Sequence, residues 1–114
     1  MTWFVPFFAI FSGIIWVVDS VDRIRLEQCR EALFELLQQE RLAGATLLIF
    51  ANKHDIDGAL SSQEITQLMQ LGTHENLKKR HWFIQSCSAV EGEGLSSGID
   101  WMVDDIAQRI FMLS

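Results

Sequence analysis

The chain has 114 residues and a formal net charge of −6, with 9 lysine and arginine residues against 15 aspartate and glutamate residues. This length is typical of a single domain, and a hydrophobic content of 49% excludes a disordered chain. The acidic balance argues against a nucleic-acid partner, because such proteins usually carry a basic surface. Two cysteines without Cys/His clustering favour a reducing compartment and argue against a disulfide-stapled module or a metal site.

The first eighteen residues contain no charged side chain, and all but four of them are apolar. This length is near the lower limit for a membrane-spanning helix, but Pro6 interrupts the run and no basic residue precedes it. We therefore predict a core strand over Gly13–Val18 and an apolar leader over residues 1–12. Three explanations of the leader stay open: a truncated or misjoined start, an alternative exon, and a membrane anchor.

Strands and helices are predicted to alternate along the rest of the chain. A helix is expected over Asp22–Glu40, because its apolar residues recur at helical spacing: Leu26, Cys29, Leu33 and Leu37. A second buried strand, Ala45–Ala51, follows, and Ser61 and Glu64 form a capping box that opens another helix.

After a charged surface connection over Thr73–Arg80, a third strand is expected over Trp82–Cys87. The last helix is predicted to begin near Ser97, with Asp100 as its capping partner. Its expected buried stripe is Ile99, Met102, Val103, Ile106 and Ile110. The alternation predicts an α/β fold with about three parallel strands and crossover helices.

In such a fold, ligands bind at the carboxyl ends of the strands. The second strand is followed there by an N-K-x-D motif, whose chemistry suits a guanine base. The Asp55 carboxylate accepts from the ring N–H and the exocyclic amine of guanine, a donor pair that adenine lacks. The Asn52 amide can donate to purine N7 or bridge loops, and the Lys53 stem can cover the base. The Ala89 N–H can donate to guanine O6. The alternative interpretation of the motif is a polar turn before a helix.

Several separate segments resemble the carboxyl-terminal part of a Ras-like small GTPase of the ADP-ribosylation factor family. They lie between residues 13 and 111 and include Gly13–Arg23, Glu40–Lys53, Cys87–Val90, Gly98–Trp101, Asp105–Ile106 and Arg109–Phe111. The resemblance implies part of the P-loop NTPase fold, GTP or GDP as ligand with magnesium in the intact family, and a cytoplasmic location. It further implies tubulin-folding cofactors, a link to microtubules, and small GTPase effectors as partners; we expect no membrane partner.

Carried over by position, the resemblance assigns guanine binding to six residues: Asn52, Lys53, Asp55, Ser88, Ala89 and Val90. Two positions depart from the wider pattern. Val90 stands where many Ras-like proteins have lysine, and Asp57 stands where relatives have proline. The second change adds a negative charge near Asp55, which we expect to weaken base binding slightly.

The 114 residues contain no G-x-x-x-x-G-K-[ST] phosphate loop and no W-D-x-G-G-Q segment. We therefore expect a guanine-specificity half without catalytic residues or magnesium ligands, and with GTP hydrolysis undetectable. The alternative is a non-catalytic interaction fragment that binds no nucleotide. The strand Ile14–Val18 is expected to be an exposed, aggregation-prone edge unless the leader or a partner covers it.

Overall fold

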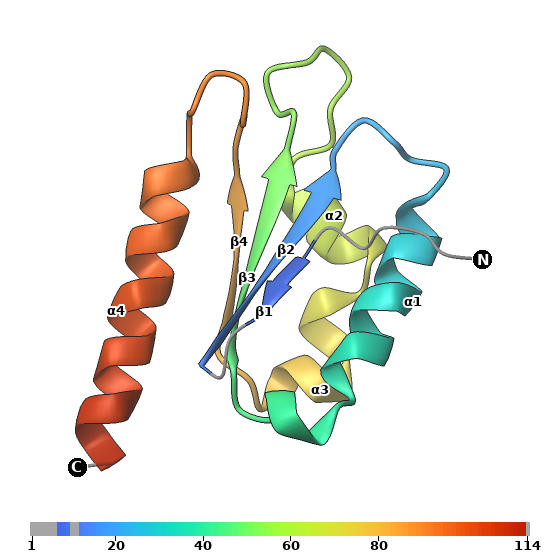
Figure 1. The fold of residues 1–114 in the computed structure, drawn as a ribbon. Coiled ribbons are helices and arrows are strands. Elements are labelled where there is room, and N and C mark those ends of the chain that lie inside the picture. Colours follow the sequence, from blue (N-terminus) through green and yellow to red (C-terminus); the bar gives the residue numbers. More distant parts are fainter. Residues whose placement is uncertain (1–6, 10–11, 114) are drawn as a thin grey trace.

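The computed structural model describes residues 7–9 and 12–113, which form one sheet with helices on both faces (Figure 1). The strands are β1 (Phe7–Ala9), β2 (Gly13–Asp19), β3 (Thr46–Asn52) and β4 (Trp82–Ser86). The α-helices are α1 (Leu26–Leu37), α2 (Ser62–Leu68), α3 (Glu75–Lys78) and α4 (Leu95–Leu113), with short 3₁₀ turns at Glu40–Leu42 and Leu71–Thr73.

The sheet order is β1-β2-β3-β4, and β2, β3 and β4 run parallel, which confirms the predicted α/β fold. Helices α1, α2 and α3 cover one face, and α4 lies alone on the other (Figure 1). Alternate residues of the strands therefore enter two cores. Ile14, Trp16 and Val18 pack with the first group of helices, whereas Leu48 and Phe50 pack with Met102 of α4.

The edge of β2 is partly covered by the chain's own leader. Strand β1 pairs with it in antiparallel register, from Phe7 opposite Trp16 to Ala9 opposite Ile14. The sheet thus has four strands, three of them parallel. The edge of β2 was expected to be exposed unless the leader or a partner covers it, and β1 of the leader covers it from Ile14 to Trp16. The leader residues 1–6, 10 and 11 lie outside the described residues, and the domain boundary at residue 13 stays a prediction. Among the described helices, none is long and apolar enough to cross a membrane.

Helix α1 is shorter than predicted, because the chain from Ser20 to Arg25 forms turns and irregular structure instead. The Asp19 carboxylate accepts the Val21 N–H at 3.0 Å, and the Asp22 carboxylate accepts the Arg25 N–H at 3.3 Å. These side-chain bonds compete with helical pairing and delay the start of the helix. The buried residues of α1 are Leu26, Leu33, Phe34 and Leu37, whereas the predicted Cys29 is only half-buried.

Helix α4 begins at Leu95, so the predicted start near Ser97 with Asp100 as capping partner is wrong. The predicted stripe is also only partly buried. Met102 is buried, but Ile99, Val103 and Ile110 are 36%, 57% and 56% exposed. The physical reason is that α4 lies alone on its face of the sheet, so one narrow stripe contacts β3 and β4 while its apolar neighbours meet solvent (Figure 1).

The connection from Thr73 to Arg80 was predicted to be a charged surface segment, and this is wrong in part. Leu77 within α3 is buried, with 3% of its surface exposed. The His74 ring stacks on Phe34 of α1, with ring centroids 3.5 Å apart. The Arg80 guanidinium donates to the carbonyl oxygens of Leu42 and Ala45, each at 2.8 Å. The segment therefore joins α1 to the start of β3.

A polar cluster closes the amino-terminal end of the parallel strands, opposite the predicted site. Thr46 Oγ1 donates to Asp105 Oδ2, and Asp105 Oδ1 lies 2.9 Å from His81 Nδ1. Arg109 Nη2 donates to Thr46 Oγ1 at 2.6 Å and to the Ser12 carbonyl at 2.7 Å. The cluster thus ties α4 to the starts of β2 and β3.

This cluster predicts a loss of stability in acid. Burial alone raises the pKa of Asp105, but the bonds from Thr46 and His81 and the charge of Arg109 outweigh it and lower the pKa. A carboxylate with a lowered folded pKa stabilises the fold above its unfolded value, about 3.9, and loses that contribution as the pH falls below it. We expect Asp105→Asn to cost about 1–2 kcal/mol at pH 7 and to reduce the loss between pH 5 and about 3. Thermal unfolding across that range measures it, with exposed Asp100→Asn as the control.

Candidate functional site

The candidate site is built from the loops that follow β2, β3 and β4, and backbone hydrogen bonds join all three. The Ser20 N–H donates to the Asn52 carbonyl at 3.1 Å, which ties the first loop to the second. The His54 N–H donates to the Cys87 carbonyl at 3.1 Å, which ties the second loop to the third. The predicted base-recognition loops are therefore neighbours in space.

Asn52 bridges the two loops with its side chain. Its Oδ1 accepts the Ala89 N–H at 2.9 Å and lies 3.7 Å from the Cys87 thiol. This is the loop-bridging role that was one of two predicted for the amide. It leaves the amide nitrogen as a donor. The Ala89 N–H, predicted to reach guanine O6, donates to Asn52 here, so its contact with a base stays a prediction.

Lys53 adopts the left-handed backbone conformation, with φ of 68°. That region costs a residue with a Cβ roughly 1–2 kcal/mol. Strained backbone of this kind clusters at functional sites, where the surrounding structure enforces it. Here the flanking bonds of Asn52 and His54 to the third loop hold the turn in place.

The Lys53 ammonium pairs with Asp19, and the Nζ to Oδ2 distance is 2.9 Å. Burial raises the pKa of Asp19, but the hydrogen bonds from Lys53 and the Val21 N–H outweigh it, so the net pKa is lowered. The hydrogen bond to Asp19 raises the pKa of Lys53. Sequence reasoning missed this pair, although Asp19 and Asn52 are register partners in β2 and β3.

The remaining predicted residues lie on the same two loops. Ser88 is buried, its N–H donates to the Glu93 carbonyl at 2.9 Å, and its hydroxyl accepts the Glu91 N–H at 3.3 Å. These bonds fold the third loop back on itself. Asp55 is exposed, and Val90 is 95% exposed. Both side chains are accessible to a ligand, and their contacts with guanine stay predictions.

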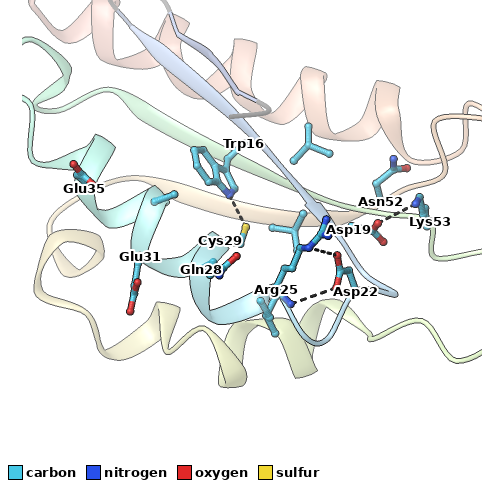
Figure 2. A pocket seen from close by; sticks show the side chains of 14 residues that line it. Trp16, Asp19, Asp22, Arg25, Gln28, Cys29, Glu31, Glu35, Asn52 and Lys53 are labelled. Carbon is cyan, nitrogen blue, oxygen red and sulfur yellow. Dashed lines mark hydrogen bonds and ion pairs between the residues drawn. The ribbon is translucent and has the colours of Figure 1, made fainter. Parts of the chain in front are cut away.

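A groove of about 770 Å³ begins at Asn52 and Lys53 and continues between β2 and α1. Trp16 and Cys29 are among its lining residues, and the Trp16 indole N–H donates to the Cys29 thiol at 3.3 Å (Figure 2). The Asp19–Lys53 pair lies at one end (Figure 2). The groove was not predicted, because it depends on how α1 packs beside β2.

The sequence profile of the ADP-ribosylation factor family matches residues 2–106. The chain belongs to the ADP-ribosylation factor family. It is 54% identical to ADP-ribosylation factor-like protein 2 of Drosophila melanogaster and to the protein of that name in Arabidopsis thaliana, and 51% identical to that of Dictyostelium discoideum. Each match covers 102 residues, 90% of this chain and 54% of the relative, so the chain spans about half the length of these relatives.

Family membership agrees with the observed architecture, since three parallel strands with their helices form part of a small GTPase fold. The family binds guanine nucleotides together with magnesium. Within residues 7–9 and 12–113, no group of three or more His, Cys, Asp or Glu side chains has the arrangement of a metal site.

Proposed function

We propose that this chain carries the guanine-recognition half of an ADP-ribosylation factor-like GTP-binding domain. The observation that supports the proposal best is the joined pair of loops after β3 and β4. Asn52 connects them through its 2.9 Å bond to the Ala89 N–H, and the strained Lys53 follows it directly. A chance N-K-x-D turn would not require a bridge to a second loop one β-α unit later.

In this proposal, Asp55 selects the base. Its carboxylate accepts the ring N–H and the exocyclic amine of guanine, while adenine would leave the charge unpaired. Lys53 covers the base face with its stem while its ammonium pairs with Asp19. Asn52, Ser88, Ala89 and Val90 form the remaining wall, with the loop shape set by the buried Ser88.

The affinity for GTP is expected to be weak. Base hydrogen bonds contribute about 1–3 kcal/mol each at best, whereas association costs an estimated 4–15 kcal/mol before any surplus appears. A Kd of about 1 mM or weaker follows, since 1 mM corresponds to about −4 kcal/mol. The phosphate-loop pattern does not occur in these 114 residues, so we expect no detectable hydrolysis by this chain alone.

The wider role follows the family resemblance. We propose a cytoplasmic protein connected to microtubules through tubulin-folding cofactors and small GTPase effectors. The second candidate function is a non-catalytic interaction fragment. The exposed apolar residues Ile99, Val103 and Ile110 of α4 favour it, because such a stripe is suited to a protein partner.

Asp55→Asn should reverse the base preference. An asparagine amide donates where the carboxylate accepts, so it matches the C2 carbonyl of xanthine and no longer matches the guanine amine. We expect guanine nucleotides to bind about tenfold more weakly to the variant, since 1.4 kcal/mol is tenfold, and xanthine nucleotides to bind better. NMR titrations of the chain with GTP, XTP and ATP measure this.

The matched control is Asp57→Asn, which removes an exposed charge from the same loop and should leave the order of the three nucleotides unchanged. Equal binding of ATP and GTP by the wild-type chain would contradict base selection. Absence of any nucleotide-dependent shift in the loop resonances would favour the interaction fragment. A submicromolar Kd for GTP would refute the predicted weakness.

A further inference from the structure

The N-K-x-D motif leaves its third position open, and this chain places His54 there. That position lies between the strained Lys53 and Asp55, the residue proposed to select the base. The His54 N–H donates to the Cys87 carbonyl at 3.1 Å, so its backbone is fixed against the segment that follows β4. Its side chain is half-buried and has no part in the base contacts proposed above.

The Glu93 backbone is fixed against the same segment from within the third loop. Ser88 and Glu93 form an antiparallel bridge, in which the Ser88 N–H donates to the Glu93 carbonyl at 2.9 Å. The next residue, Gly94, has a φ of 83°. A Cβ at Gly94 would lie 3.1 Å from the Cα of Cys87, so a larger residue would push this turn away. Glu93 therefore lies beside the segment that also binds His54.

The side chains of His54 and Glu93 meet across this segment. His54 Nε2 lies 3.5 Å from Glu93 Oε2, and the contact is an ion pair when the imidazole is protonated. Within the described part of the chain, Nε2 is buried and makes no hydrogen bond, which leaves a polar atom without the partner it had in water. An ordinary N–H···O bond is about 2.9 Å long, so a small rotation of the exposed Glu93 carboxylate would complete one.

These contacts form a closed ring between the second and third loops. The His54 N–H holds the Cys87 carbonyl, and the following residue, Ser88, holds the Glu93 carbonyl through its own N–H. The Glu93 carboxylate then closes the ring at the imidazole. Ala89 comes directly after the buried Ser88. The position of the ring therefore sets the position of residues 88–90, the proposed wall of the base site.

We propose that His54 is a positioning residue of the guanine site, which clamps the third loop to the second through Glu93. This inference rests on the proposed function, because the clamp holds the wall at residues 88–90 where a base is expected. His54 acts through that loop and makes no base contact in this proposal. A clamp beside the Asn52 bridge limits how far the loops can separate, so less binding free energy is spent on ordering them.

Amide hydrogen exchange, measured by NMR on the full chain, tests the clamp without nucleotide. We expect His54→Ala and Glu93→Ala each to speed exchange of the Ser88 and Ala89 amides about twofold to fivefold. The double variant should be no faster than either single variant, because each substitution breaks the same contact. His54→Lys should restore the wild-type rates while Glu93 is present, since its ammonium also donates to a carboxylate.

Two controls separate the clamp from a general loss of stability. Glu91→Gln, an exposed position on the same loop, should leave both amides unchanged. The Ala43 N–H donates to the Glu40 carbonyl before β3, at the opposite end of the sheet, and should exchange at the wild-type rate in every variant. Acceleration at Ala43 would signal general unfolding and overturn the proposal. Additive effects of the two alanine substitutions would also overturn it.

NMR titration of the same variants with GTP tests the positioning role. We expect His54→Ala and Glu93→Ala to raise the Kd for GTP about twofold to fivefold, and His54→Lys to restore it. If the wild-type chain binds GTP and His54→Ala binds it equally well, the clamp does not position the wall and this inference fails alone. If the wild-type chain binds no GTP, the proposed function fails and the positioning role fails with it.

Discussion

Replacing Gly98 with valine should destabilise the chain by about 3 kcal/mol or more. Gly98 lies where α4 crosses β3, and a Cβ there would come within 2.6 Å of Phe50 Cε1 and 2.9 Å of its Cζ. The Phe50 ring is 5% exposed and has little room to move. Alanine would gain about 1 kcal/mol of helix propensity against about 1–3 kcal/mol of overpacking. Valine adds further volume with a smaller gain in helix propensity, so the clash dominates.

Urea unfolding followed by tryptophan fluorescence measures this effect. Gly72→Ala is the matched control, because a methyl group at that position would have no atom within 4 Å and the residue is exposed. The control should stay within about 0.5 kcal/mol of the wild type. A Gly98→Val chain that unfolds at the wild-type urea concentration would show that α4 does not pack on Phe50 as described.

The three parallel strands were predictable to within one residue at each end. The predicted strands Gly13–Val18, Ala45–Ala51 and Trp82–Cys87 correspond to the observed strands Gly13–Asp19, Thr46–Asn52 and Trp82–Ser86. Continuous apolar runs between turn residues specify strands buried on both faces, and this signal is local in the sequence. Helix ends were less predictable, since they depend on contacts with distant residues.

The start of α4 shows this limit. Ser97 and Asp100 match a capping pattern, yet the helix already begins at Leu95. Gly94, with φ of 83°, makes the preceding turn, and a Cβ there would lie 2.3 Å from the Ser86 carbonyl oxygen. The glycine was visible in the sequence, but its close approach to β4 was not. Tertiary contact, rather than the capping pattern, fixes this boundary.

The candidate site was predictable at the level of its loops and not of its pairings. Asn52 ends β3 and Ala89 lies in the loop after the neighbouring parallel strand β4, and their hydrogen bond agrees with that placement. The Lys53–Asp19 pair and the groove beside it require the register of β2 on β3 and the packing of α1. Neither the strand register nor the packing of the helix can be read from a short sequence motif.

Arg80 is the second position at which substitution is expected to cause a large loss of stability. From the sequence, it was predicted to lie in a charged surface connection. Its Nη1 donates to the Leu42 and Ala45 carbonyls at 2.8 Å, and its Nη2 lies 3.4 Å from the Leu37 carbonyl. Burial and the charge of Arg109 lower the pKa of Arg80, but an arginine stays protonated at neutral pH. One guanidinium therefore joins the end of α1 to the start of β3.

Arg80→Ala should cost about 3 kcal/mol, because each buried carbonyl left without a donor costs about 1–3 kcal/mol and water replaces part of the loss. The stability of Arg80→Lys should lie between those of Arg80→Ala and the wild type. A single ammonium keeps the charge but cannot donate to several carbonyls at once as the planar guanidinium does. Urea unfolding measures all three chains, with the exposed neighbour Lys79→Ala expected within about 0.5 kcal/mol of wild type. If Arg80→Ala and Lys79→Ala unfold together, the guanidinium is solvated and does not hold α1 against β3. If Arg80→Lys is as stable as wild type, charge alone suffices and the forked geometry has no role.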